Sequence, residues 1–150
     1  MRICSGPGCL RAVNDDVRFC DECSPVVALV DGLREHSVTD RERYASLYSG
    51  RRWQRVREQA MRLHPLCDRC QLRVSEIIDH RIPAGVAIQQ AIASGLYPLD
   101  RVAGFYFMSN LQGLDRACHW DKTLEDKLHT GAWPDVIAIE QQSRKRVFSF

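Results

Sequence analysis

The sequence predicts an α+β fold in which a strand, a loop, a second strand and a helix surround one metal ion. Three observations predict it: a C-x2-C pair at Cys67 and Cys70, an apolar run that ends in Asp79 and His80, and a Cys-His pair at 118–119. Thiolates, imidazoles and carboxylates are the side chains that hold divalent cations in proteins. This stretch therefore contains enough ligands for one structural and one catalytic metal site.

The length of 150 residues is that of one common domain. The sequence contains no apolar run near the roughly 18 residues that span a bilayer, and its first residues do not resemble a signal peptide. We therefore expect a soluble, cytoplasmic protein with no membrane partner. In that compartment the seven cysteines are better explained by metal binding than by disulfides. The net charge is only +2, but residues 51–75 carry seven arginines against Glu58 and Asp68, a candidate footprint for phosphates.

Residues 1–25 are expected to form a small zinc knuckle. The pattern is C-x4-C-x10-C-x2-C, and its four candidate zinc ligands are Cys4, Cys9, Cys20 and Cys23. Because this stretch has too few large apolar side chains to fold alone, a tetrahedral zinc site would supply its order. Free thiols are the alternative. Residues 26–45, which begin with an apolar run at 26–33, are expected to form a structural connector.

An amphipathic helix is expected near the start of the main domain, which we place at residues 46–130. Its apolar residues recur at i, i+3, i+7 and i+10, the spacing of one helical face: Trp53, Val56, Ala60 and Leu63. Ser49 is the expected N-cap, and Pro65 ends the helix. Five arginines of this helix lie mostly off the apolar stripe: Arg51, Arg52, Arg55, Arg57 and Arg62. They either contact phosphates, with Arg51, Arg52 and Arg55 as the candidates, or form a solvated basic face.

Cys67 and Cys70 follow this helix and predict a second structural zinc site. No thioredoxin-like strand and helix surround the pair, so zinc explains it better than redox chemistry. Cys118 is the expected third ligand. Asp115 has the spacing of a fourth ligand, but it could equally be the N-cap of the helix that carries Cys118. Water and His64 are the other candidate donors.

A catalytic cation site is expected where Asp79 and His119 approach each other. Asp79 and His80 end the first strand, and His119 lies early on the helix that follows the second strand. A carboxylate and an imidazole suit Mg, Mn, Ni or Zn. The expected elements are strands over 75–79 and 109–113 and a helix over 116–129.

Residues 81–108 are expected to form a long insertion between the two halves of this site. We expect a helix over 86–94, and we expect the aromatic stretch 105–107 to belong to the core. The C-terminal tail, 131–150, is expected to be helical from Asp135. Its role is open, because it could pack on the domain or contact a partner.

These motifs, in this order, resemble those of the HNH endonucleases, in particular the small phage and prophage type. The residues that carry the resemblance are RRWQRVRE, HPLCDRC, DH, NLQGL and CHWDKT, within roughly residues 43–124. The resemblance implies a ββα-metal fold, in which a hairpin and a helix hold one divalent cation, with DNA as substrate. The chain departs from the family at Asp115, where a second C-x2-C often has its first cysteine.

The resemblance also implies roles for individual residues. His80 is the expected general base, Asp79 and His119 are the expected cation ligands, and Asn110 is expected to fix the loop that holds His80. Lys122 is expected near the DNA backbone, with a solvated surface lysine as the alternative. An unperturbed histidine has a pKa near 6.5, so His80 can be neutral and accept a proton at pH 7.

The function implied by the resemblance is a metal-dependent DNA endonuclease with one divalent catalytic cation and two structural zinc ions. The family further implies a phage or prophage origin and, by analogy alone, a link to a terminase in DNA packaging. The alternative, from another class, is a catalytically inactive, zinc-dependent DNA-binding module. Four intact residues argue against it: Asp79, His80, Asn110 and His119.

Overall fold

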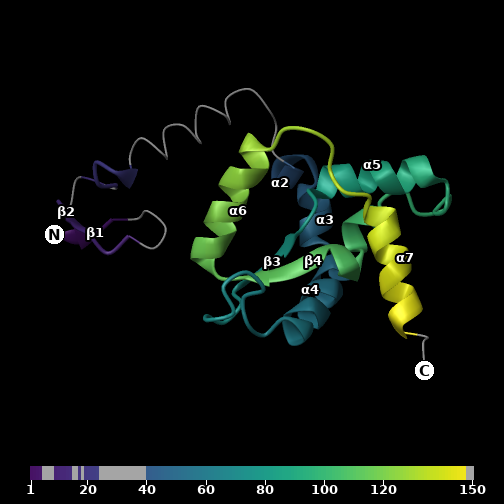
Figure 1. Cartoon of the computed structure of the whole chain (residues 1–150), viewed down its shortest axis with the longest axis horizontal. Helices are drawn as coiled ribbons and strands as arrows, with labels where there is room; N and C mark the ends of the chain where they lie inside the picture. Colours follow the sequence, from purple (N-terminus) through teal and green to yellow (C-terminus); the bar gives the residue numbers. More distant parts are fainter. Residues whose placement is uncertain (5–8, 15–16, 18, 24–39, 148–150) are drawn as a thin grey trace.

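The computed structural model describes residues 1–4, 9–14, 17, 19–23 and 40–147 and confirms the predicted α+β class (Figure 1). The expected apolar segment 26–33 lies outside the described residues. In the described part, no helix is both long and apolar enough to cross a membrane. The elements, in chain order, are β1 (Arg2–Ile3), β2 (Ala12–Val13), α2 (Asp40–Arg43), α3 (Ala45–Ser49), α4 (Arg51–Leu63), β3 (Ile77–His80), α5 (Ala84–Ser94), the 3₁₀ turns η1 (Ala103–Tyr106) and η2 (Met108–Asn110), β4 (Leu111–Leu114), α6 (Arg116–Leu128) and α7 (Val136–Val147).

The site is built on an antiparallel pair of strands, β3 and β4, followed directly by α6. In this pair Ile78 lies opposite Gly113, and Asp79 lies opposite Gln112. Successive residues of a strand point to opposite faces, and in β3 the burial alternates accordingly, with Asp79 half-buried and His80 buried. Asp79 and His80 therefore leave the hairpin on different sides.

The first strand begins later than the sequence predicts. Residues 75 and 76 were expected to be part of it, but Ser75 closes the loop that carries the C-x2-C pair, and only the Glu76 amide still donates to β4, at the Leu114 carbonyl. The Cys67 amide donates to the Arg73 carbonyl, the Ser75 amide donates to the Pro65 carbonyl, and Leu66 bridges to Val74. These local bonds use backbone groups that a longer strand would need, so the strand starts at Ile77 instead of residue 75, while Asp79 and His80 end it as predicted.

The helix cap predicted at Ser49 is also wrong. Ser49 ends α3, where its hydroxyl donates to the carbonyl of Ser46, and the extended residue Gly50 is the N-cap of α4. A single residue thus separates the two helices. The predicted end of α4 is close to the observed one, since His64 is the C-cap and Pro65 follows.

The main core lies between α4, β3, β4 and the end of the insertion. Trp53 and Ala60 of α4 pack with Phe105 and Leu111. Phe105 is fully buried and Phe107 nearly so, which confirms the expectation that these aromatic residues belong to the core.

Gly113 lets β4 pass close to the end of α4. A Cβ atom at this position would lie 2.2 Å from Ser75 Oγ and 2.8 Å from the carbonyl oxygen of His64. Both distances are far below van der Waals contact, so only glycine fits here.

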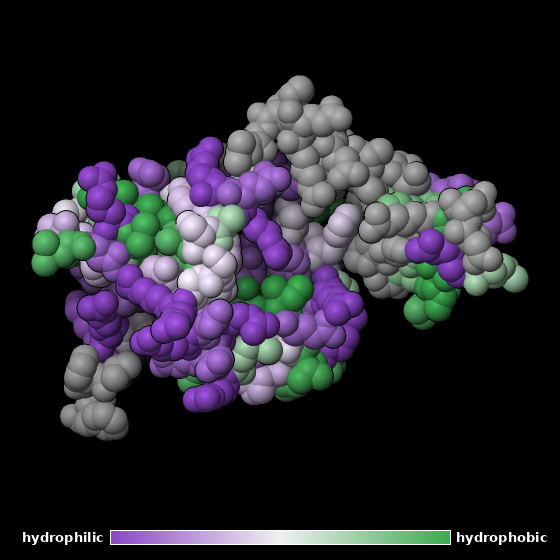
Figure 2. Space-filling model, turned by 180° about the vertical axis from the view of Figure 1, so that it is seen from behind, coloured by the Kyte–Doolittle hydropathy of each residue, from purple (hydrophilic) through white to green (hydrophobic). Residues whose placement is uncertain are grey.

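A second core cluster joins the insertion to the C-terminal helix. Helix α5 begins at Ala84, two residues before the predicted start. The Gln90 side chain donates to the Pro134 carbonyl and accepts from the Val136 amide, and Val136 is fully buried. Figure 1 shows α7 beside α5. The C-terminal segment is therefore part of the main body. Hydrophilic side chains cover most of the face seen in Figure 2.

Candidate metal and catalytic site

A cavity of about 680 Å³ lies between β3, α3, α4 and α6. The predicted residues Asp79, His80, His119 and Lys122 all line it, although they come from two elements separated by the insertion. Two lining residues that the sequence analysis did not single out are Tyr48 and Asp126. The fold thus brings the expected base and the expected cation ligands to one place.

His80 is almost completely enclosed by aromatic rings and is only 3% exposed. Trp53 stacks on the imidazole at a centroid distance of 5.6 Å and an interplanar angle of 17°, and Phe105 lies 4.9 Å away. The ring edge of Tyr48 contacts Trp53 and Phe105 as well as His80. This packing fixes the plane of the imidazole.

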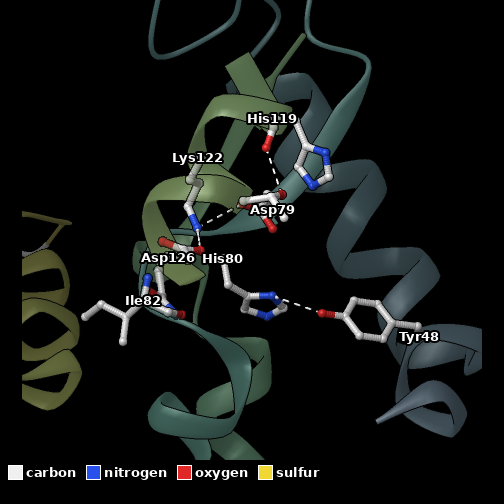
Figure 3. Close-up of polar contacts among 9 residues, drawn as sticks. Tyr48, Asp79, His80, Ile82, His119, Lys122 and Asp126 are labelled. Atoms are coloured by element: carbon white, nitrogen blue, oxygen red, sulfur yellow. Dashed lines mark hydrogen bonds and ion pairs between the residues drawn. The ribbon is translucent and has the colours of Figure 1, made fainter. Parts of the chain in front are cut away.

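Hydrogen bonds determine which nitrogen of His80 carries the proton. Nε2 lies 2.9 Å from the carbonyl oxygen of Phe105, and Nδ1 lies 3.5 Å from the Tyr48 hydroxyl (Figure 3). A carbonyl oxygen only accepts, so Nε2 must donate. In the neutral imidazole Nδ1 is then the basic nitrogen.

Asp79 lies on the other side of the hairpin, against α6. Figure 3 shows the imidazole of His119 near its carboxylate and the ammonium of Lys122 between Asp79 and Asp126. Lys122 Nζ lies 3.2 Å from Asp79 Oδ2 and also pairs with Asp126. Burial raises the pKa of Asp126, although Lys122 acts in the opposite direction. Lys122 is only 7% exposed, so the alternative of a solvated surface lysine is wrong.

Asn110 fixes the backbone that follows His80. Its Oδ1 accepts from the Ile82 amide and its Nδ2 donates to the Ile82 carbonyl, both at 2.9 Å. The Arg81 amide also donates to the Asn110 carbonyl at 2.7 Å. Asn110 is 1% exposed. Asn110 thus holds the loop after His80 through both its side chain and its backbone.

The second cysteine cluster lies where β4 joins α6. Ligand atoms of Cys67, Cys70, Asp115 and Cys118 all lie within 4.8 Å of one another. Zn–S bonds of about 2.3 Å in a tetrahedron place sulfur atoms roughly 3.8 Å apart, so this donor set fits zinc. Burial and the neighbouring Asp115 raise the pKa of the Cys118 thiol to about 12, which a bound cation would reverse. His64 is not in the cluster, because its Nδ1 pairs with Asp68 at 2.8 Å.

Asp115 makes the contacts of a helix N-cap and also lies where a metal ligand would. Its Oδ1 accepts from the amides of Ala117 and Cys118, as an N-cap does. Its Oδ2 faces the thiols and accepts from Cys70 at 3.2 Å. Burial acts to raise the pKa of Asp115, but bonds from the three thiols and the Cys118 amide together lower it. One carboxylate can therefore cap the helix with one oxygen and bind a metal with the other.

The four N-terminal cysteines form the other group with metal-binding spacing. Sulfur atoms of Cys4, Cys9, Cys20 and Cys23 lie within 4.8 Å of one another. The Cys9 and Cys20 sulfurs are 3.8 Å apart, and the Cys20 amide donates to the Cys4 sulfur. The short strands β1 and β2 support this group through antiparallel pairing. This donor set also fits a structural zinc ion.

The arginines expected to contact DNA lie away from the cavity. Arg52 pairs with Asp100 at 2.8 Å and its guanidinium lies 3.8 Å from the centre of the Tyr106 ring. Arg51 and Arg55 are exposed, and neither is among the described residues that line the cavity.

The described arrangement defines a class of site: an antiparallel strand pair and the following helix place an Asp and two His at one cavity, and a buried Asn holds the loop after the first His. Among solved structures, the chain is similar to the HNH endonuclease of the deep-sea thermophilic bacteriophage GVE2, determined with manganese ion. The TM-score is 0.43 and the sequence identity is 25%, over 67% of this chain and 96% of the other. No protein-family model and no curated protein matches the chain.

Proposed function

We propose that this chain is a metal-dependent DNA endonuclease that hydrolyses phosphodiester bonds to 5′-phosphate and 3′-hydroxyl ends. One observation carries the proposal. The Nε2–H bond from His80 to the Phe105 carbonyl leaves Nδ1 basic, in the cavity that also holds Asp79 and His119. A base of fixed orientation beside two cation-binding side chains supports metal-assisted hydrolysis more than DNA binding alone.

His80 would act as the general base through Nδ1. With its proton on Nε2, the neutral imidazole carries a lone pair on Nδ1, which can take a proton from an attacking water. The resulting imidazolium keeps its Nε2–H bond to Phe105, and the aromatic rings around it prevent the ring from turning away. The Tyr48 hydroxyl, 3.5 Å from Nδ1, marks the side of the ring that a water would approach.

Asp79 and His119 would hold the divalent cation, and a hard oxygen with an imidazole nitrogen accepts Mg, Mn, Ni or Zn. A cation held there would supply stabilisation of negative charge on the phosphate and on the leaving 3′ oxygen. Lys122, which now pairs with Asp79, would remain beside the reacting phosphate through its bond to Asp126. The two cysteine groups would hold structural zinc ions, and the side of α4 that borders the cavity would contact the DNA backbone.

A plasmid-cleavage assay of wild type and His80→Ala, with a series of divalent cations and with EDTA, tests the proposal. We expect wild type to cut only with a cation and His80→Ala to be slower by about 10²–10⁴-fold, with DNA binding retained. His129→Ala is a matched control, since His129 is exposed and outside the cavity. Equal rates for His80→Ala and wild type would refute the role of His80. A wild type that binds DNA but never cuts it would favour the inactive binding module.

A further inference from the structure

We propose that Arg57 and Arg41 form a phosphate clamp that holds the DNA strand beside the scissile bond. The inference rests on the proposed nuclease function and adds its substrate-positioning residues. It places these contacts on a different face of α4 from the arginines that the sequence suggested.

The two arginines face the cavity from separate elements. Arg57 lies on α4 and Arg41 on α2, and both line the cavity that holds Asp79 and His80. Both are exposed, and among the described residues neither forms an ion pair. A guanidinium that forms no ion pair with the described residues and borders a cavity favours an anionic ligand there, because its charge attracts negatively charged groups.

The rotation of α4 explains why Arg57 reaches this cavity. Trp53 is buried and stacked on His80, which fixes one face of the helix against the candidate base. Arg57 lies four residues further on and Gln54 one residue further on, and both line the cavity with Trp53. Residues four apart share a helical face, so the contact that holds His80 also turns Arg57 toward the substrate.

The other arginines of α4 differ in ways that make them controls. Arg52 is already engaged by the Asp100 carboxylate and the Tyr106 ring. Arg55 has the same side chain on the same helix and is exposed like Arg57, but it does not line the cavity in the described structure. The comparison of Arg57 with Arg55 therefore changes position while charge, residue type and helix stay the same.

The chemistry of the clamp suits DNA phosphates. A guanidinium donates two parallel bonds to the oxygens of one phosphate, and such charge-assisted bonds are strong. Two guanidiniums on two elements would bind neighbouring phosphates of one strand and would fix the scissile phosphate relative to His80. Phosphate contacts position the nucleic acid without reading its sequence, so the clamp should not depend on base identity.

Single-turnover cleavage at saturating enzyme tests the clamp directly. We expect Arg57→Gln and Arg41→Gln each to lower the rate constant by about 10- to 100-fold, the effect of losing a charge-assisted bond that orients the substrate. We expect Arg55→Gln to retain the wild-type rate constant. Equal losses for Arg57→Gln and Arg55→Gln, or no loss for Arg57→Gln, would overturn the inference while leaving nuclease activity established.

Equilibrium binding to a short duplex without added divalent cation provides an arm that does not depend on cleavage. Arg57→Gln should reduce the slope of log K against log salt by about one unit, the change for one lost phosphate contact. An unchanged slope would exclude a phosphate contact at Arg57 even if the wild type cuts no DNA. If the wild type never cuts DNA but Arg57→Gln still has a smaller slope than wild type, the phosphate contact stands and only the nuclease function is refuted.

Discussion

Asp115→Asn separates the helix cap that the Asp115 carboxylate forms from the metal-ligand role that we propose for it. Oδ1 caps α6 through the amides of Ala117 and Cys118, at 3.0 and 3.3 Å, while Oδ2 faces the thiols. Asparagine keeps a carbonyl oxygen for the cap, and asparagine and aspartate cap helices about equally well. It removes the anionic oxygen that would bind zinc. Asp115→Ala removes both functions, and Asp115→Cys supplies a thiolate ligand without the cap.

The expected magnitudes of the two losses differ widely. Removing a helix cap costs about 0.5–2 kcal/mol of the free energy of unfolding. Losing a structural zinc costs far more, since its binding contributes roughly 10–16 kcal/mol in small metal-dependent domains. If Oδ2 is a zinc ligand, Asp115→Asn and Asp115→Ala should both be strongly destabilised. If Asp115 is only a cap, Asp115→Asn should be close to wild type and Asp115→Ala should lose about 1 kcal/mol.

Zinc content and unfolding curves together measure the effect. We expect two zinc ions per chain in wild type and in Asp115→Cys, with the latter less stable by about 1 kcal/mol for its lost cap. We expect Asp115→Asn to hold one zinc, or to release the second to a chelator far faster than wild type does. Two firmly held zinc ions and near-normal stability in Asp115→Asn would refute the ligand role and leave the fourth ligand unidentified.

Three further predictions concern the cavity. Asp79→Ala and His119→Ala should weaken Mn²⁺ binding in calorimetric titration and abolish cleavage while zinc content stays unchanged; full Mn²⁺ affinity in both would remove the proposed ligands. Asn110→Ala should lower the free energy of unfolding by about 2–4 kcal/mol, because it breaks two buried bonds to Ile82, and a loss below about 1 kcal/mol in a denaturation curve would contradict this. Lys122→Met should tighten Mn²⁺ binding by about 10-fold or more, because like charges about 4 Å apart repel by up to ~4 kcal/mol near a protein surface; weaker binding in the same titration would contradict it.

The parts of the site that depend on local spacing could be predicted from the sequence. Cys67 and Cys70, and likewise Asp115 and Cys118, are three residues apart, and a tight turn or the first turn of a helix brings such pairs together without help from the rest of the chain. The structure accordingly gathers these four side chains into one group. The succession of a strand and a helix at 111–128 followed for the same reason, because β4 and α6 are adjacent in sequence, whereas β3 is separated from β4 by the insertion.

The start of β3 could not be predicted, because the backbone groups of residues 74 and 75 could pair either with β4 or within the loop that carries Cys67 and Cys70. Val74 is β-branched and favours a strand, and extending the hairpin would have satisfied its neighbours. The loop that carries Cys67 and Cys70 competes for the same backbone amides and carbonyls. Its hydrogen bonds from Cys67 to Arg73 and from Ser75 to Pro65 determine the outcome. A backbone hydrogen bond has no signature in residue type, so composition and periodicity could not distinguish the two arrangements.

The orientation of the candidate base was likewise beyond the sequence, because it depends on a backbone atom and on long-range packing. The carbonyl of Phe105 sets the tautomer of His80 across 25 residues, and any residue at that position would present the same oxygen. Trp53 then links the base to α4 by stacking. That single tertiary contact sets the rotation of the helix, and the rotation decides that Arg57 rather than Arg55 faces the cavity. Periodicity showed that α4 has a basic side, but only the position of His80 shows which of its arginines borders the cavity.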